Sequence, residues 1–171
     1  MSVSSLSAVL LGLALLGRSP APQPVQVPAN VDARLFTGDV RTLLRLSPTF
    51  RVQCQRIAAD PRVLVHLSVV TTIDGGGRAQ TTFHRYPTGA IVADVDVLFG
   101  GDYRELLAHE FEHVIEQLDG VDLRREMAGG RAWQVGAGAF ETRRALLAGL
   151  QVVRETGRPS TAHVRAVQET R

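Results

Sequence analysis

The chain has 171 residues, and 44% of them are hydrophobic, which is enough to build the core of a single domain. Its 19 basic residues, all arginines, are scattered along the chain with no basic stripe interleaved with aromatics, so the composition argues against nucleic-acid binding. Cys54 is the single cysteine and excludes an internal disulfide.

The N-terminal part has the composition of an export signal followed by a linker. Residues 8–16 form an apolar run that is too short to span a bilayer as a helix, so residues 1–19 are interpreted as a signal peptide. The proline-rich residues 20–30 are expected to be an extended linker, and residues 31–171 a single folded domain. This pattern predicts a secreted or periplasmic protein. The alternative is an uncleaved N-terminal anchor, and membrane contact is expected only in that case.

The folded part is predicted to begin with two short helices, over residues 40–46 and 50–59, separated by Pro48. A β region follows, in which glycine- and proline-containing turns separate segments rich in β-branched residues. The predicted strands are residues 62–73, 79–86 and 90–99. The sequence therefore predicts a small three-stranded sheet, antiparallel or mixed.

The last of these strands alternates apolar residues with Asp94 and Asp96, so the two carboxylates share one face. A strand with carboxylates on one face is expected to be half-exposed and near an edge of the sheet. His66 and His84, on the first two strands, are interpreted as ordinary packed or surface histidines.

The strongest motif reads H-E-x-x-H from His109 to His113, inside a helix predicted over residues 102–119. The two histidines are one helical turn apart on the same face, close enough to share a metal ion. Two neutral imidazoles suit Zn²⁺, and Glu110 beside them could take a proton from a metal-activated water. Asp102 is a good N-cap for this helix.

An apolar stripe on the same helix predicts which side is buried. The stripe consists of Leu107, Phe111, Val114 and Leu118, which recur at helical spacing. The two histidines point nearly opposite to it. We therefore expect the helix to bury one side in the core and to turn its histidines toward another surface.

Two histidines hold zinc weakly without a third protein ligand. Glu141 is the favoured candidate, because it is predicted to lie on a second long helix, residues 131–155, among small residues that let two helices approach closely. Asp119 stands at the place of the third metzincin ligand, but Glu116 occupies the position of the turn glycine of that family. The remaining alternatives are Glu126 and His163.

Three strands, an H-E-x-x-H helix and a second helix bearing a glutamate resemble a minimal zincin metallopeptidase of the gluzincin type. The resemblance covers roughly residues 62–150. It implies an α+β fold in which His109, His113 and Glu141 hold Zn²⁺. It also implies a metalloendopeptidase that hydrolyses a peptide or protein substrate, with Glu110 as general base.

The same resemblance suggests how a substrate is bound. The strand that precedes the motif helix, residues 90–99, would pair with an extended peptide by edge-strand addition. Tyr86 or His163 could stabilise the transition state. The oligomeric state is left open by the sequence.

Other classes of function share some of these residues. The first is a zinc-binding interaction or regulatory module without catalysis, which would be closed by a fourth protein ligand. The second is a metal-free helical interaction domain, and the third is a metallohydrolase that acts on something other than peptides. Retention of Glu110 favours catalysis, because a purely structural site has no use for a base at that position.

Overall fold

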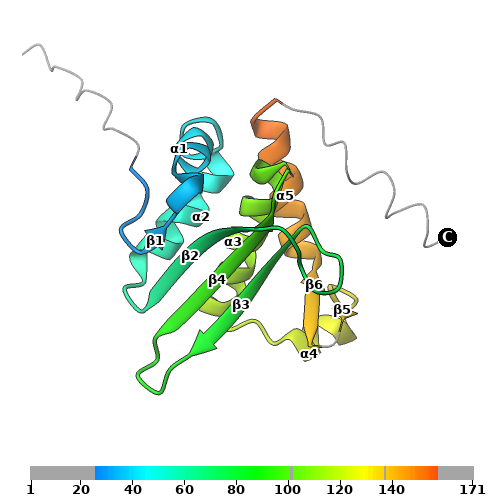
Figure 1. Cartoon of the computed structure of the whole chain (residues 1–171). Helices are drawn as coiled ribbons and strands as arrows, with labels where there is room; N and C mark the ends of the chain where they lie inside the picture. Colours follow the sequence, from blue (N-terminus) through cyan, green and yellow to red (C-terminus); the bar gives the residue numbers. More distant parts are fainter. Residues whose placement is uncertain (1–25, 101, 137, 158–171) are drawn as a thin grey trace, which may run out of the picture.

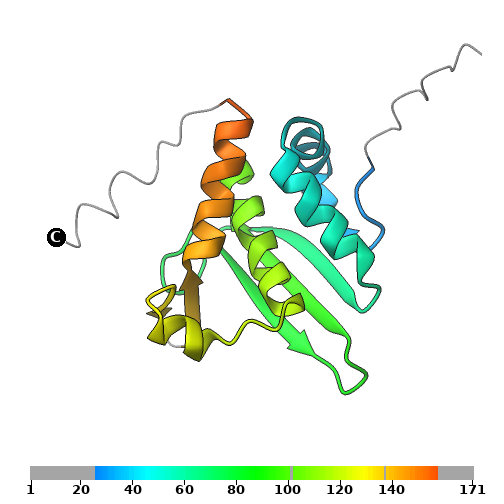
Figure 2. The same ribbon diagram turned by 180° about the vertical axis from the view of Figure 1, so that it is seen from behind.

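The computed structural model describes residues 26–100, 102–136 and 138–157. They form an α+β fold in which helices cover one face of a mixed four-stranded sheet. Figure 1 shows the sheet in front of the helices, and Figure 2, seen from behind, shows the helices in front of the sheet. The predicted signal peptide, most of the predicted linker and His163 lie outside the described residues. Within the described ranges, every helix is too short or too polar to cross a membrane.

The helices are η1 (Arg34–Phe36), α1 (Thr37–Leu46), α2 (Pro48–Ala59), α3 (Tyr103–Leu118), α4 (Leu123–Ala128) and α5 (Arg143–Glu155). The strands are β1 (Val31–Asp32), β2 (Val63–Val70), β3 (Ala79–Arg85), β4 (Ile91–Leu98), β5 (Ala132–Gly136) and β6 (Ala139–Thr142). Both predicted N-terminal helices are present as α1 and α2, and each begins a few residues earlier than the sequence pattern indicates. Pro48 is the first residue of α2, where its missing N–H costs no helical hydrogen bond.

The three predicted strands are β2, β3 and β4, and the short β1 adds a fourth to the sheet. The strand order is β1-β2-β4-β3. The β1–β2 and β2–β4 pairs are parallel, whereas β3 is antiparallel to β4. The sheet is therefore mixed, and β3 is the edge strand on the side away from β1.

The position of β4 corrects one prediction. Because β4 pairs with β2 on one side and with β3 on the other, it is an interior strand, and the expectation that it lies near an edge and binds substrate is wrong. Asp94 and Asp96 are partly exposed because they point away from the buried face of the strand. On that outer face Asp94 pairs with His66 at 2.9 Å and with His84 at 3.1 Å.

Helix α3 packs against the covered face of the sheet through the predicted stripe. Leu107, Phe111 and Val114 are fully buried in the core, as expected from their helical spacing. Phe111 also stacks on Phe50 of α2, with 5.1 Å between the ring centroids. Asp102 caps the helix as predicted, since its carboxylate accepts the N–H of Arg104.

The predicted second long helix is wrong over its first half. The strands β5 (Ala132–Gly136) and β6 (Ala139–Thr142) pair as an antiparallel hairpin, and α5 begins only at Arg143. Gly138 in the hairpin turn has φ +77°, a left-handed conformation that a continuous right-handed helix excludes. Glu141 therefore lies on β6, immediately before α5 and not within it.

Helices α3 and α5 run side by side, as Figure 2 shows. A Cβ added at Gly149 of α5 would lie 3.1 Å from the backbone oxygen of Glu105 and 3.5 Å from the Cβ of His109. The absence of a side chain at Gly149 thus lets α5 approach the backbone of α3 beside the first motif histidine. This close approach brings the start of α5, and with it β6, to the histidine face of α3.

Candidate metal centre

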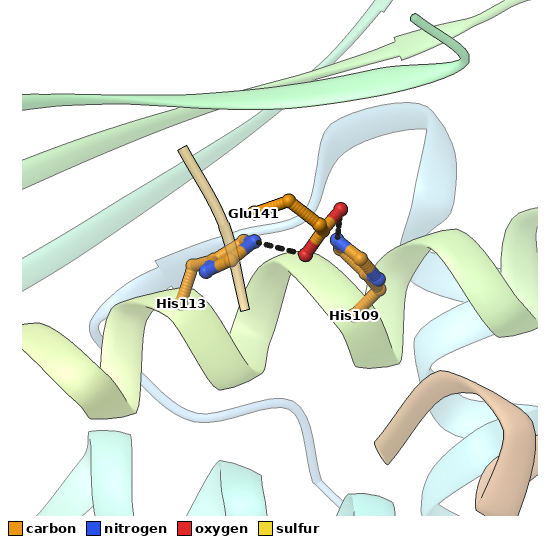
Figure 3. Close-up of side chains that lie close together, drawn as sticks. All are labelled: His109, His113 and Glu141. Atoms are coloured by element: carbon orange, nitrogen blue, oxygen red, sulfur yellow. Dashed lines mark ion pairs between the residues drawn. The ribbon is translucent and has the colours of Figure 1, made fainter. Parts of the chain in front are cut away.

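Three side chains from two elements meet beside α3. His109 and His113 come from α3, one turn apart, and their ring centroids are 4.9 Å from each other. Glu141 reaches them from β6. Figure 3 shows the Glu141 carboxylate between the two imidazoles. Each histidine side chain is 14% exposed and that of Glu141 is 19% exposed, so the group is largely buried yet touches solvent.

The spacing of these atoms suits a metal ion. Nε2 of His109 lies 3.1 Å from Oε2 of Glu141, and Nε2 of His113 lies 3.5 Å from Oε1 of Glu141. One ligand atom from each of the three residues lies within 4.8 Å of the other two. Two ligands that are each about 2.0–2.1 Å from a tetrahedral zinc ion are about 3.3 Å apart. The three residues are therefore positioned to hold a metal ion without large rearrangement.

The ionisation of this group reflects its crowding with carboxylates. Burial would lower the pKa of His113, but its hydrogen bonds to Glu116 and Glu141 and the charge of Glu110 outweigh burial and raise the pKa to about 10. Burial would raise the pKa of Glu141, but its hydrogen bonds with His109 and His113 lower it to about 2. In the metal-free protein His113 is thus protonated at neutral pH, and a metal ion that binds there displaces this proton.

Glu110, the second residue of the motif, is buried next to the group. Its Oε2 accepts a hydrogen bond of 2.7 Å from the hydroxyl of Thr81 on the edge strand β3. Its charge also helps to raise the pKa of His113. The structure thus provides an ionisable carboxylate beside the three residues that could hold a metal.

Glu116 is a member of the site that the sequence analysis missed. It is 2% exposed, lies 2.9 Å from Nδ1 of His113 through its Oε2, and accepts a hydrogen bond of 2.6 Å from the hydroxyl of Thr142 through its Oε1. The sequence analysis considered Glu116 only as the residue that replaces a turn glycine. Its spacing of three residues from His113, which places the two on one helix face, is the signal that could have identified it.

The structure also locates the other candidates for a third ligand. Asp119, at the end of α3, forms ion pairs with Arg56 and Arg144, at 2.5 Å and 2.7 Å. Glu126 forms an ion pair with Arg131 at 2.6 Å. Neither belongs to the group around His109 and His113. Of the candidates within the described residues, only Glu141 is brought to the histidines.

Tyr86, suggested as a stabiliser of the transition state, is exposed just beyond the end of β3. Among the described residues, it makes no hydrogen bond or ion pair with the site. The alternative for that role, His163, is outside the described part of the chain. The site residues that the structure brings together are therefore the H-E-x-x-H motif, Glu141 and Glu116.

The fold and the site together define an α+β protein with a His-His-Glu group that could hold a metal ion. Comparison of the chain with protein-family models, with curated proteins and with solved structures finds no match. Nitrogen and carboxylate ligands of this kind bind several divalent metals, so the three residues leave the identity of the metal open.

Proposed function

We propose that this protein is a zinc-dependent metallopeptidase of the gluzincin type. The observation that supports this proposal best is a buried carboxylate, Glu110, beside a His-His-Glu group that could hold a metal ion. Two histidines and one glutamate leave a fourth position for water on a tetrahedral ion, which is the arrangement of catalytic zinc sites. In this proposal His109, His113 and Glu141 are the metal ligands.

The proposed reaction is hydrolysis of a peptide bond by an activated water. When bound, Zn²⁺ would polarise the substrate carbonyl and make water more acidic. Glu110 would accept the proton of the attacking water and pass it to the departing amine. The hydrogen bond from Thr81 would orient the Glu110 carboxylate for this transfer.

We propose that an extended peptide binds along β3 instead of β4. In the sheet order β3 is a terminal strand, so one of its edges is not used by the strands of the described sheet. Thr81 of the same strand contacts Glu110, so a peptide added along β3 would pass close to the proposed base. The substrate is thus expected to be a peptide or a flexible segment of a protein. The predicted signal-like segment makes a secreted or periplasmic substrate the natural choice.

Metal content and proteolysis measured on the same samples test the proposal. Purified wild-type protein should contain stoichiometric zinc and cleave peptides in a mixed library followed by mass spectrometry. Glu110→Gln should retain the zinc but lose activity by about 10²–10⁴-fold, the usual contribution of a general base. Glu141→Ala should lose both. Glu126→Gln, which changes a glutamate of α4 outside the group, is the matched control and should retain both.

Full activity in Glu110→Gln would exclude Glu110 as the base. Stoichiometric zinc in the wild-type protein without cleavage of any peptide would instead support a zinc-binding module without catalysis. Absence of zinc from the wild-type protein, even after reconstitution, would instead support the alternative of a metal-free helical interaction domain.

A further inference from the structure

We infer that Glu116 and Thr142 form a positioning pair that holds two of the proposed metal ligands, His113 and Glu141, in binding geometry. The inference depends on the metal centre of the proposed function and is independent of whether peptides are the substrate. Neither residue is a proposed ligand. Their roles follow from four hydrogen bonds, one within α3, two within the junction of β6 and α5, and one, from Thr142 to Glu116, that connects α3 to this junction.

The burial of the Glu116 carboxylate requires partners, because a buried carboxylate is unfavourable unless it is paired. Its two oxygens have different partners: Oε2 lies 2.9 Å from Nδ1 of His113, and Oε1 accepts the hydroxyl proton of Thr142 at 2.6 Å. One partner is on the same helix, and the other belongs to the strand that carries Glu141. The carboxylate therefore connects the two halves of the site.

The contact with His113 orients the imidazole. A carboxylate at Nδ1 accepts the proton of that nitrogen, which directs Nε2 and its lone pair away from Glu116. In this structure Nε2 of His113 points toward Glu141, as Figure 3 shows. Glu116 thus selects both the rotamer and the tautomer in which His113 can bind a metal through Nε2.

The contact with Thr142 orients Glu141. Thr142 follows Glu141 in the chain, and its backbone N–H donates to Oε1 of Glu141 at 2.7 Å. Its hydroxyl donates to Glu116 and also accepts the N–H of Ala145 at 3.0 Å, which caps the start of α5. A hydroxyl can donate one hydrogen bond and accept others at the same time, so both contacts can form together. Fixing Thr142 on Glu116 therefore fixes the Glu141 carboxylate relative to α3.

Substitutions at these two positions separate a positioning role from simple packing. Thr142→Val has nearly the same shape but cannot donate to Glu116, whereas Thr142→Ser retains the hydroxyl. Glu116→Gln keeps the shape and removes the charge that holds the Nδ1 proton. A matched control is Thr156→Val, because Thr156 also uses its hydroxyl at an end of α5 but contacts only backbone oxygens at the far end of the helix.

The experiment measures zinc affinity of the full chain by competition with a chromogenic chelator. We expect Thr142→Val and Glu116→Gln to weaken zinc binding by about 10–100-fold, the usual effect of removing an outer hydrogen-bond partner of a ligand. Thr142→Ser and Thr156→Val should bind zinc as the wild-type protein does. As a second readout, the absorption spectrum of the Co²⁺-saturated protein should change in Thr142→Val and not in Thr156→Val, because Co²⁺ reports ligand geometry.

Wild-type affinity in both Thr142→Val and Glu116→Gln would overturn the inference and leave the proposed function intact. A lower melting temperature of the metal-free variants with unchanged affinity and Co²⁺ spectrum would show that the pair is only structural, and would also overturn it. Failure of the wild-type protein to bind zinc would refute the inference and the proposed function together.

Discussion

Four glutamates of α3 are buried, and their partners divide them into two kinds. Glu105 and Glu112 each form an ion pair with an arginine, Arg78 and Arg144, so their charge is compensated. In the described part of the chain, Glu110 and Glu116 form no ion pair with an arginine. Glu116 instead lies 2.9 Å from Nδ1 of His113, and the charge of Glu110 helps to raise the pKa of His113. Without an arginine partner, the negative charge of these two buried carboxylates favours positive charge at the histidines, which the proton of His113 supplies in the metal-free protein and a metal ion could supply instead. Charge compensation thus separates the structural glutamates of α3 from those of the site.

Glu155, near the end of α5, is a carboxylate whose role is structural and can be tested by pH. It accepts hydrogen bonds from the hydroxyl and backbone N–H of Thr49 at the start of α2, at 2.7 Å and 3.1 Å, and also from Ser47 and Gln151. Burial would raise its pKa, but these hydrogen bonds lower it from 4.5 to about 2. Because the folded-state pKa is the lower one, the charge stabilises the fold fully above pH 4.5, and this stabilisation is lost as the pH falls toward 2.

We therefore expect Glu155→Gln to lower the free energy of unfolding by about 1–2 kcal/mol at neutral pH, the range of a partly exposed charged hydrogen bond. The difference between wild type and variant should shrink as the pH falls from 4.5 toward 2. Urea unfolding of both proteins across this range measures it. A difference that does not change with pH would show that the ionised carboxylate is not what stabilises this contact.

Among the elements, the contact of α3 with α5 controls the site, since the two helices carry or adjoin all the proposed ligands. The contact is close because Gly149 faces the backbone of α3 and because the buried Ala145 lies one turn before it. The hairpin β5–β6, which precedes α5 in the chain, places Glu141 beside α3. The geometry of the site therefore depends on how closely these two helices pack.

Gly149→Ala should destabilise the protein, although alanine is the better helix former. The added Cβ would meet a backbone oxygen at 3.1 Å, and such overpacking costs about 1–3 kcal/mol against a gain of about 1 kcal/mol in helix propensity. We expect a net loss of about 1 kcal/mol in thermal or urea unfolding, together with weaker metal binding. Gly38→Ala in α1, where an added Cβ has open space, is the control and should stabilise. A gain in stability from both substitutions would contradict the close contact.

At the scale of the whole molecule, the proposed metal would connect segments that are distant in the chain. His109 and His113 lie on a helix of the core, and Glu141 lies on a small hairpin outside the main sheet. The three residues come together only in the folded protein. An ion that binds all three therefore stabilises the folded state by mass action.

Saturating zinc should therefore raise the melting temperature, and a chelator should reverse the increase. At about 100 times the dissociation constant the stabilisation is about 2.7 kcal/mol, which for a domain of this size corresponds to an increase of about 5–10 °C. Differential scanning calorimetry with zinc and with chelator measures it, and His113→Ala should abolish the shift. An equal melting temperature of the wild-type protein under both conditions would argue against the metal centre.

Features encoded within one turn or one helix were predictable from the sequence. The boundaries of α3, its Asp102 cap, its buried stripe and the shared face of His109 and His113 all follow from spacing along a single helix. Glu141 was selected for a reason that is wrong, since it lies on a hairpin strand and not on a helix face. Residues 131–142 were wrongly predicted as helix. The glycine-rich segment there is compatible with a helix or with a hairpin, and the sequence alone does not show where the chain turns.

The interior position of β4, the partnership of Glu116 with Thr142 and the approach of Glu141 to α3 could not be predicted. Each depends on contacts between residues that are far apart in the sequence, such as Glu116 and Thr142 or the paired strands β2 and β4. Local spacing carries no information about such contacts, because they form only when the hydrophobic faces of separate elements pack together. The chain thus encodes its candidate metal-binding helix locally, whereas the third residue of the group and its supporting hydrogen bonds are supplied by packing.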